Sequence, residues 1–168
     1  MKNRIMALLG LCTILYSCSA DGYADYDPGR TRMQPMSGEW YIVTYGPDGE
    51  PAFEGDYVLW TTYNTAADND EMWVADKRKV QLFKSKVDAD LSDFTFSGPE
   101  GAPNLAGDAA VTVKNGKIIK NGGKAFSSKT VVDSIYFEVE FAEEPGIIYS
   151  FSGHERTGFL EDDDPTIH

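Results

Sequence analysis

Hydrophobic and polar residues alternate in short runs along most of this chain. From Gly38 onward, apolar residues recur at every second position in stretches rich in Val, Ile, Tyr, Phe, Trp and Thr. This alternation is typical of strands with one buried and one solvated face. The expected strands lie within GEWYIVTYG, GDYVLWTTYNT, EMWVAD, VQLFKSKVDA, DFTFSG, AAVTVKNGKIIK, VVDSIYFEVEFA and IIYSFSGHERTGF.

The connections between these runs are short and consist mainly of Gly, Pro, Asn and Asp. Asn115-Gly116 is a strong hairpin signal, because a type I′ turn needs positive φ at both central positions. No stretch beyond Met36 combines helical apolar spacing with a capping residue. The pattern therefore predicts an all-β fold of eight or nine successive antiparallel strands.

Closure of such a meander is expected, because an open one exposes two long strand edges to aggregation. An antiparallel up-and-down β-barrel of about eight strands removes both edges. A two-sheet sandwich is the alternative.

The N-terminus has the form of an export signal. Lys2 and Arg4 precede an apolar run at 5–16, which is shorter than the roughly 20 residues of a membrane span. The run ends in Leu15-Tyr16-Ser17-Cys18, which resembles the bacterial lipobox. That resemblance implies a lipoprotein signal peptide at 1–17 and acylation of Cys18. A plain secretory signal is the alternative.

Three segments follow from this interpretation: the signal at 1–17, an acylated Cys and flexible tether at 18–36, and a barrel domain at 37–168. The tether is expected because its sequence is polar, contains Gly and Pro, and lacks periodicity. The N-terminal acyl chains would hold the protein at a membrane, since two chains anchor stably where one does not.

Charge narrows the range of partners. The chain has 27 acidic and 15 basic residues, with a net charge of −12. Nucleic acid is not an expected partner, because binding to it depends on basic residues that neutralise phosphates. No cofactor is expected, and nothing in the sequence indicates an oligomeric state.

The acidic segment TTYNTAADNDEMWVAD joins two expected strands. Its carboxylates Asp68, Asp70 and Glu71 fit a metal loop, a catalytic cluster or the polar tip of a hairpin. A calcium loop of the EF-hand kind needs a sharp-turn Gly and a distal Glu, and neither follows here. We therefore expect a hairpin tip and no metal site, with weak calcium binding as the alternative.

Catalytic signals are weak. His154 is the one imidazole in the expected barrel away from the C-terminal residue, and it lies near Ser152, but no G-x-S-x-G nucleophile elbow occurs. We assign no catalytic residue and expect binding rather than catalysis. A hydrolase that uses Ser152 or His154 stays as an alternative.

The stretch GEWYIV resembles the G-x-W opening of lipocalins and their calycin relatives. In that superfamily the Trp seals one end of the barrel, and an Arg near the end of the last strand packs over it. The resemblance implies a barrel-closing set of Gly38, Trp40 and Arg156. The helix that follows the lipocalin barrel has no obvious counterpart in this chain.

A wider resemblance covers most of the chain. SGEWYIVTY, TTYNTAADNDEMWVAD, the FKSKV strand and GHERTGF are similar to a Bacteroidetes lipoprotein family called lipid-binding putative hydrolases. This resemblance implies a lipocalin-like barrel, anchoring in the cell envelope at the outer membrane, and a small hydrophobic ligand.

Four aromatic residues are the candidate ligand-binding side chains: Trp60, Tyr63, Trp73 and Phe83. Each of them also suits an ordinary core. The alternative function is a non-catalytic interaction module for a partner envelope protein.

Overall fold

The computed structural model describes residues 29–52, 55–77 and 81–163. The chain divides into two units, residues 1–30 and 31–168, of which the second contains the strands named below. The predicted signal peptide and Cys18 lie outside the described residues.

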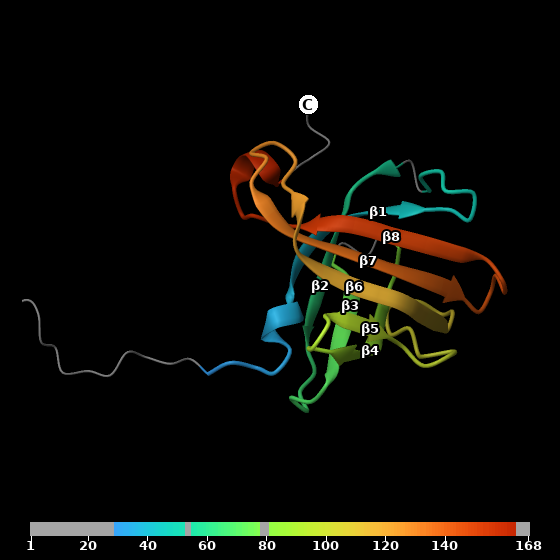
Figure 1. The fold of residues 1–168 in the computed structure, drawn as a ribbon. Coiled ribbons are helices and arrows are strands. Elements are labelled where there is room, and N and C mark those ends of the chain that lie inside the picture. Colours follow the sequence, from blue (N-terminus) through green and yellow to red (C-terminus); the bar gives the residue numbers. More distant parts are fainter. Residues whose placement is uncertain (1–28, 53–54, 78–80, 164–168) are drawn as a thin grey trace, which may run out of the picture. The chain divides into compact units, whose positions relative to one another are not determined.

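Eight strands follow one another in the second unit (Figure 1). They are β1 (Gly38–Tyr45), β2 (Val58–Asn64), β3 (Glu71–Asp76), β4 (Lys84–Asp90), β5 (Thr95–Ser97), β6 (Val111–Lys124), β7 (Val131–Phe141) and β8 (Ile148–Glu155). Within the described ranges, the short 3₁₀ helices η1 (Gln34–Met36) and η3 (Leu160–Asp162) flank the strands. None of the helices in these described ranges is long and apolar enough to cross a membrane.

The strands form a closed antiparallel barrel in sequence order, in which each strand pairs with its neighbours in the chain. The first and last strands complete it, and Trp40 and Tyr41 of β1 lie opposite Glu155 and His154 of β8. This confirms the predicted up-and-down barrel and excludes the sandwich. Closure pairs both strand edges that an open meander would expose.

The prediction of a hairpin at Asn115-Gly116 is wrong, because both residues lie inside the long strand β6. The register with β7 shifts between Lys114 and Lys117, as in a β-bulge. Asn115 has a φ of +52°, and a Cβ at Gly116 would lie 2.3 Å from the Phe96 ring. The positive φ of Asn115 and the lack of a side chain at Gly116 therefore allow β6 to bend around the Phe96 ring.

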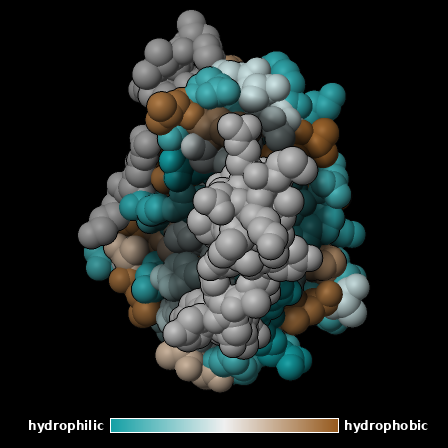
Figure 2. All heavy atoms as spheres, turned by 90° about the vertical axis from the view of Figure 1, so that its left-hand side faces the viewer, coloured by the Kyte–Doolittle hydropathy of each residue, from teal (hydrophilic) through white to brown (hydrophobic). Residues whose placement is uncertain are grey.

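The barrel interior is filled by inward-facing side chains of alternate strand positions. Trp60 lies at its centre, with its ring centroid 5.2 Å from Phe83, 5.5 Å from Phe137 and 5.2 Å from Phe151. Eight-stranded barrels are just wide enough for packed side chains or one small ligand, and here aromatic rings occupy the centre. On the face shown in Figure 2, the described hydrophobic residues form separate patches among hydrophilic ones.

The helix η1 closes one end of the barrel, which we call the closed end. Met33 and Met36 are 0% and 1% exposed and belong to the core. The Thr62 hydroxyl on β2 donates to the Met36 carbonyl oxygen at 2.6 Å. The predicted tether at 18–36 is therefore wrong in its last residues, because two methionines gain burial by covering the open end of the core.

Candidate functional site

An apolar recess lies at the opposite end of the barrel, which we call the mouth. Its volume is about 270 Å³. Phe141 at the end of β7 and Tyr149 and Phe151 of β8 form one side, and Leu82 before β4 forms the other. Phe151 is buried, whereas Leu82 is 50% exposed. The recess thus leads from solvent to the edge of the aromatic core.

Polar groups stand at the rim of the mouth. Gln81, Glu143 and Glu144 line it together with the apolar side chains. The Tyr149 hydroxyl donates to the Glu144 carboxylate at 3.0 Å. This hydrogen bond and partial burial raise the pKa of Tyr149, so the phenol stays protonated at neutral pH. A few oriented polar groups around an apolar floor are typical of sites for small hydrophobic ligands.

The structure separates the four predicted ligand-binding aromatics into two pairs. Trp60 and Phe83 point inward and are 1% and 0% exposed. Tyr63 and Trp73 lie opposite each other on β2 and β3 and face outward, because their neighbours along each strand occupy the interior. The four residues therefore do not line one common pocket, since successive strand residues point to opposite faces, and Trp60 and Phe83 belong to the core.

The sequence did not identify Leu82 or Tyr149 as mouth residues. Leu82 is an apolar residue in a loop position with a φ of +48°. The sequence carried no signal for this role, because Leu82 lies within the run VQLFKSKVDA, which the pattern predicts to be a strand, whereas β4 begins at Lys84.

A second recess of about 280 Å³ lies on the outer face of the barrel. We call it the outer recess. It lies between β3, β4 and the connection from β5 to β6, and its apolar lining consists of Trp73, Val87, Pro99, Ala102, Pro103 and Leu105. Glu71, Lys86 and Asp88 complete its lining.

The predicted barrel-closing set is only partly correct. Trp40 is 2% exposed, and its indole N–H donates to the Thr62 hydroxyl at 2.9 Å. Gly38 lies under this indole, since a Cβ there would be 3.3 Å from the ring. These two residues therefore help to close the end that η1 covers.

Arg156 does not form the expected seal over Trp40, and among the described residues no cation–π contact joins the two. Its guanidinium binds Glu39 at 2.7 Å and Asp163 at 2.6 and 2.8 Å. Glu39 precedes Trp40 and so faces the outside of the barrel. Arg156 therefore ties β1 to the C-terminal segment on the outer face.

His154 is 8% exposed, and its Nε2 has no hydrogen-bond partner. The imidazole packs beside Tyr41 and Tyr57, with centroids 6.0 and 5.6 Å away. Burial lowers its pKa, which nearby Asp162 partly opposes. Ser152 is exposed on the same strand. Among the described residues the His154 Nε2 has no hydrogen bond to Ser152, so this geometry gives no support for an activated nucleophile pair.

Asp162 fastens the C-terminal segment to the connection between β6 and β7. Its carboxylate accepts hydrogen bonds from the Ser127 and Ser128 backbone N–H groups and from the Ser128 and Thr157 hydroxyls. Burial raises its pKa, but these hydrogen bonds outweigh burial and lower the pKa to about 2. The carboxylate therefore stays ionised in mildly acidic solution.

The acidic segment is a hairpin tip, as predicted, since it joins the antiparallel strands β2 and β3. The Asp68 carboxylate accepts the Arg32 backbone N–H at 2.7 Å. The Arg32 side chain binds Asp70 at 2.5 and 3.1 Å. Within the described ranges no group of three potential metal ligands is close enough to hold an ion.

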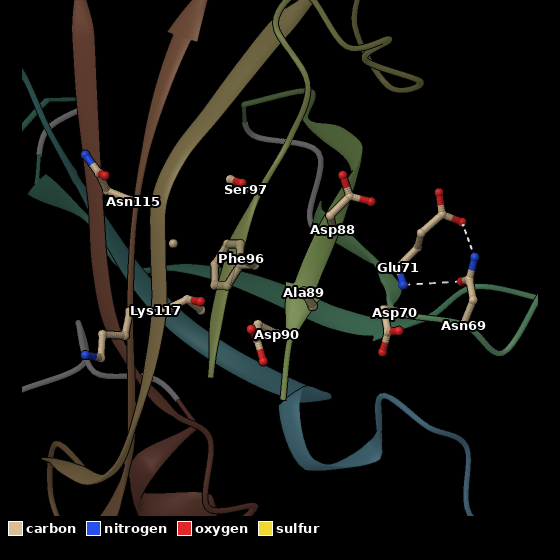
Figure 3. Close-up of a pocket in the computed structure, with 12 residues that line it drawn as sticks. Asn69, Asp70, Glu71, Asp88, Ala89, Asp90, Phe96, Ser97, Asn115 and Lys117 are labelled. Carbon is tan, nitrogen blue, oxygen red and sulfur yellow. Dashed lines mark hydrogen bonds between the residues drawn. The ribbon is translucent and has the colours of Figure 1, made fainter. Parts of the chain in front are cut away.

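A broad, open groove of about 840 Å³ runs across the outside of β4, β5 and β6 beside this tip. In Figure 3, Asp88, Glu71 and Asp70 lie to one side of Phe96, and Asn115 and Lys117 of β6 lie to the other. Asn69 is hydrogen-bonded to Glu71 at the edge of the groove. These polar walls differ from the apolar lining of the mouth.

The fold and the mouth together define a class: small, closed antiparallel β-barrels with a recess at one end. The chain belongs to the lipid-binding putative hydrolase family, whose model matches residues 25–160. No curated protein matches the chain. Family and fold are both compatible with binding of a lipid or another small hydrophobic molecule.

Proposed function

We propose that the protein binds a small hydrophobic or lipid-like ligand at the mouth of its barrel. The apolar recess that leads to Phe151 is the observation that carries this proposal. The filled interior limits how deep a ligand reaches. A volume of about 270 Å³ is just below the roughly 300–1,000 Å³ of typical small-molecule pockets. The recess therefore suits one ring or a short length of acyl chain.

Binding of a neutral apolar probe tests this function. N-phenylnaphthylamine should bind the purified protein and gain fluorescence as it leaves water. Leu82→Glu places a charge in the recess and should weaken binding at least tenfold, because burying a carboxylate beside an apolar probe is costly. Leu82 is half-exposed, so the fold should tolerate the change.

Leu160→Glu is the matched control, since Leu160 is 87% exposed and does not line the mouth. This variant should bind the probe like the parent protein. Equal binding by the parent and both variants would rule out the mouth as the site.

The same proposal includes anchoring of the protein at the cell envelope through an acylated Cys18. The membrane would be the outer membrane, and the protein would come from a Bacteroidetes bacterium. The lipobox-like sequence supports anchoring, and the similarity to envelope lipoproteins supports the destination. Cys18→Ala should abolish labelling by a fatty-acid probe and move the protein to the soluble fraction. Labelling that persists in this variant would contradict the assignment.

A further inference from the structure

The outer recess has walls that are fixed before any ligand arrives. Trp73 faces outward from β3, and the loop that carries Pro103 and Leu105 lies against β4. The Ser85 hydroxyl donates to the Pro103 carbonyl at 3.2 Å, and the Leu105 N–H donates to the Lys84 carbonyl at 2.7 Å. The Lys84 N–H donates to the Asn104 side chain at 2.9 Å. These bonds hold the loop in place, so little ordering would accompany binding.

The chemistry of the recess is divided between an apolar lining and a polar rim. Half-buried Trp73 and exposed Pro103 and Leu105 offer an apolar surface that water meets directly. Glu71 and Lys86 form an ion pair of 2.5 Å beside it. Asp88 lies opposite Glu71 on the neighbouring strand and is exposed. The rim therefore presents both hydrogen-bond donors and acceptors.

We propose that the outer recess binds a neutral sugar ring, such as a pyranose unit of a glycan. One face of a pyranose consists of C–H groups, which suit the electron-rich face of an indole. Its hydroxyl edge both donates and accepts, which matches Asp88 and Lys86. A purely apolar ligand would desolvate these charged groups without offering them a hydrogen bond.

Charge selects against ionic ligands. An anionic ligand would meet the carboxylates of Glu71 and Asp88 on a chain whose net charge is −12. A cationic ligand would compete with Lys84, whose ammonium already lies 4.9 Å from the centre of the Trp73 ring. A neutral ring is repelled by none of these charges. No residue lines both this recess and the mouth, so the proposal is independent of lipid binding.

Tryptophan fluorescence provides the test. Trp40 and Trp60 are buried in the core, so a sugar should perturb mainly Trp73. The full protein would be titrated with methyl glycosides of glucose, galactose, mannose and N-acetylglucosamine. At least one should bind saturably, and the corresponding glucuronide should bind at least fivefold more weakly than the glucoside if glucose is the preferred ring.

Variants locate the site by calorimetry with the best-binding sugar. Trp73→Ala should weaken binding at least tenfold, and Asp88→Asn about fivefold, with unchanged far-ultraviolet circular dichroism. Phe159→Ala removes an exposed aromatic residue outside the recess and should leave the affinity unchanged. Failure of all four glycosides to bind, or equal binding by the Trp73→Ala variant, would overturn the proposal.

Discussion

The two ends of the barrel differ in what covers them. At the closed end, Met33 and Met36 from a segment outside the barrel join Trp40 in the core. At the mouth, Phe141 and Tyr149 are only partly buried against the same core, and a recess remains. One end therefore contributes burial and stability, and the other retains apolar surface for a ligand.

The largest effect is expected at the closed end. Trp40→Ala should lower the free energy of unfolding by about 3–5 kcal/mol, since it empties a buried indole site and removes the hydrogen bond to Thr62. Chemical denaturation measures this loss. Trp73→Ala is the control, because loss of a half-buried tryptophan on the outer face of the barrel should lower the free energy of unfolding clearly less. An equal cost for the two variants would contradict the assignment of the core.

The helix η1 at the closed end should contribute somewhat less to the free energy of unfolding than Trp40 does. Met36→Ala removes a fully buried thioether side chain and should cost about 2–3 kcal/mol, within the range for buried methionine. Leu105→Ala, at a residue that is 61% exposed, should stay within about 0.5 kcal/mol. If Met36→Ala also stayed within that limit, the segment before β1 would not belong to the core.

The ion pairs of Arg156 on the outer face of the barrel should have a moderate effect on stability. Arg156→Ala should cost about 1–3 kcal/mol, because it removes the charged hydrogen bonds from the guanidinium to Glu39 and Asp163, although Lys77 still pairs with Glu39. Combining it with Glu39→Gln should give less than the sum of the two losses, as for residues in contact. Plain additivity in this double-mutant cycle, measured by denaturation, would show that the ion pair carries no coupling energy.

A smaller loss of stability is expected at mildly acidic pH. Burial lowers the pKa of His154, so the unfolded chain binds a proton at a higher pH than the folded one. The stability that the neutral imidazole contributes is therefore full above about pH 6.5 and is lost as the pH falls below it.

Few of the described groups lie close to His154, so its contribution to the pH dependence of stability can be measured separately. Burial raises the pKa of Tyr57, and Asp162 has a pKa of about 2, so neither group changes its charge in this range. Melting temperatures between pH 7.5 and pH 5 should fall more in the parent than in His154→Phe. A parallel pH dependence would assign the loss to other groups.

Several features were predictable because they depend on residues close together in the chain. Each alternating run of the sequence overlaps one of the observed strands, and the acidic tip between β2 and β3 was recognised from its flanking strands. Closure also followed, since a meander of this length needs its edges paired. The family resemblance identified the protein's class correctly.

The tertiary structure decided the rest, because those features depend on contacts between distant residues. Trp60 and Trp73 look alike in sequence, but the register between strands placed one inside and the other outside. Gly116 looks like a turn residue in the sequence, but in the structure a glycine is needed there because Phe96 of another strand lies against it. Likewise, only folding brings Glu39 to Arg156 and Met36 to the end of the barrel that it closes. Alternation sets the face of a strand residue relative to its neighbours, whereas packing selects its partner.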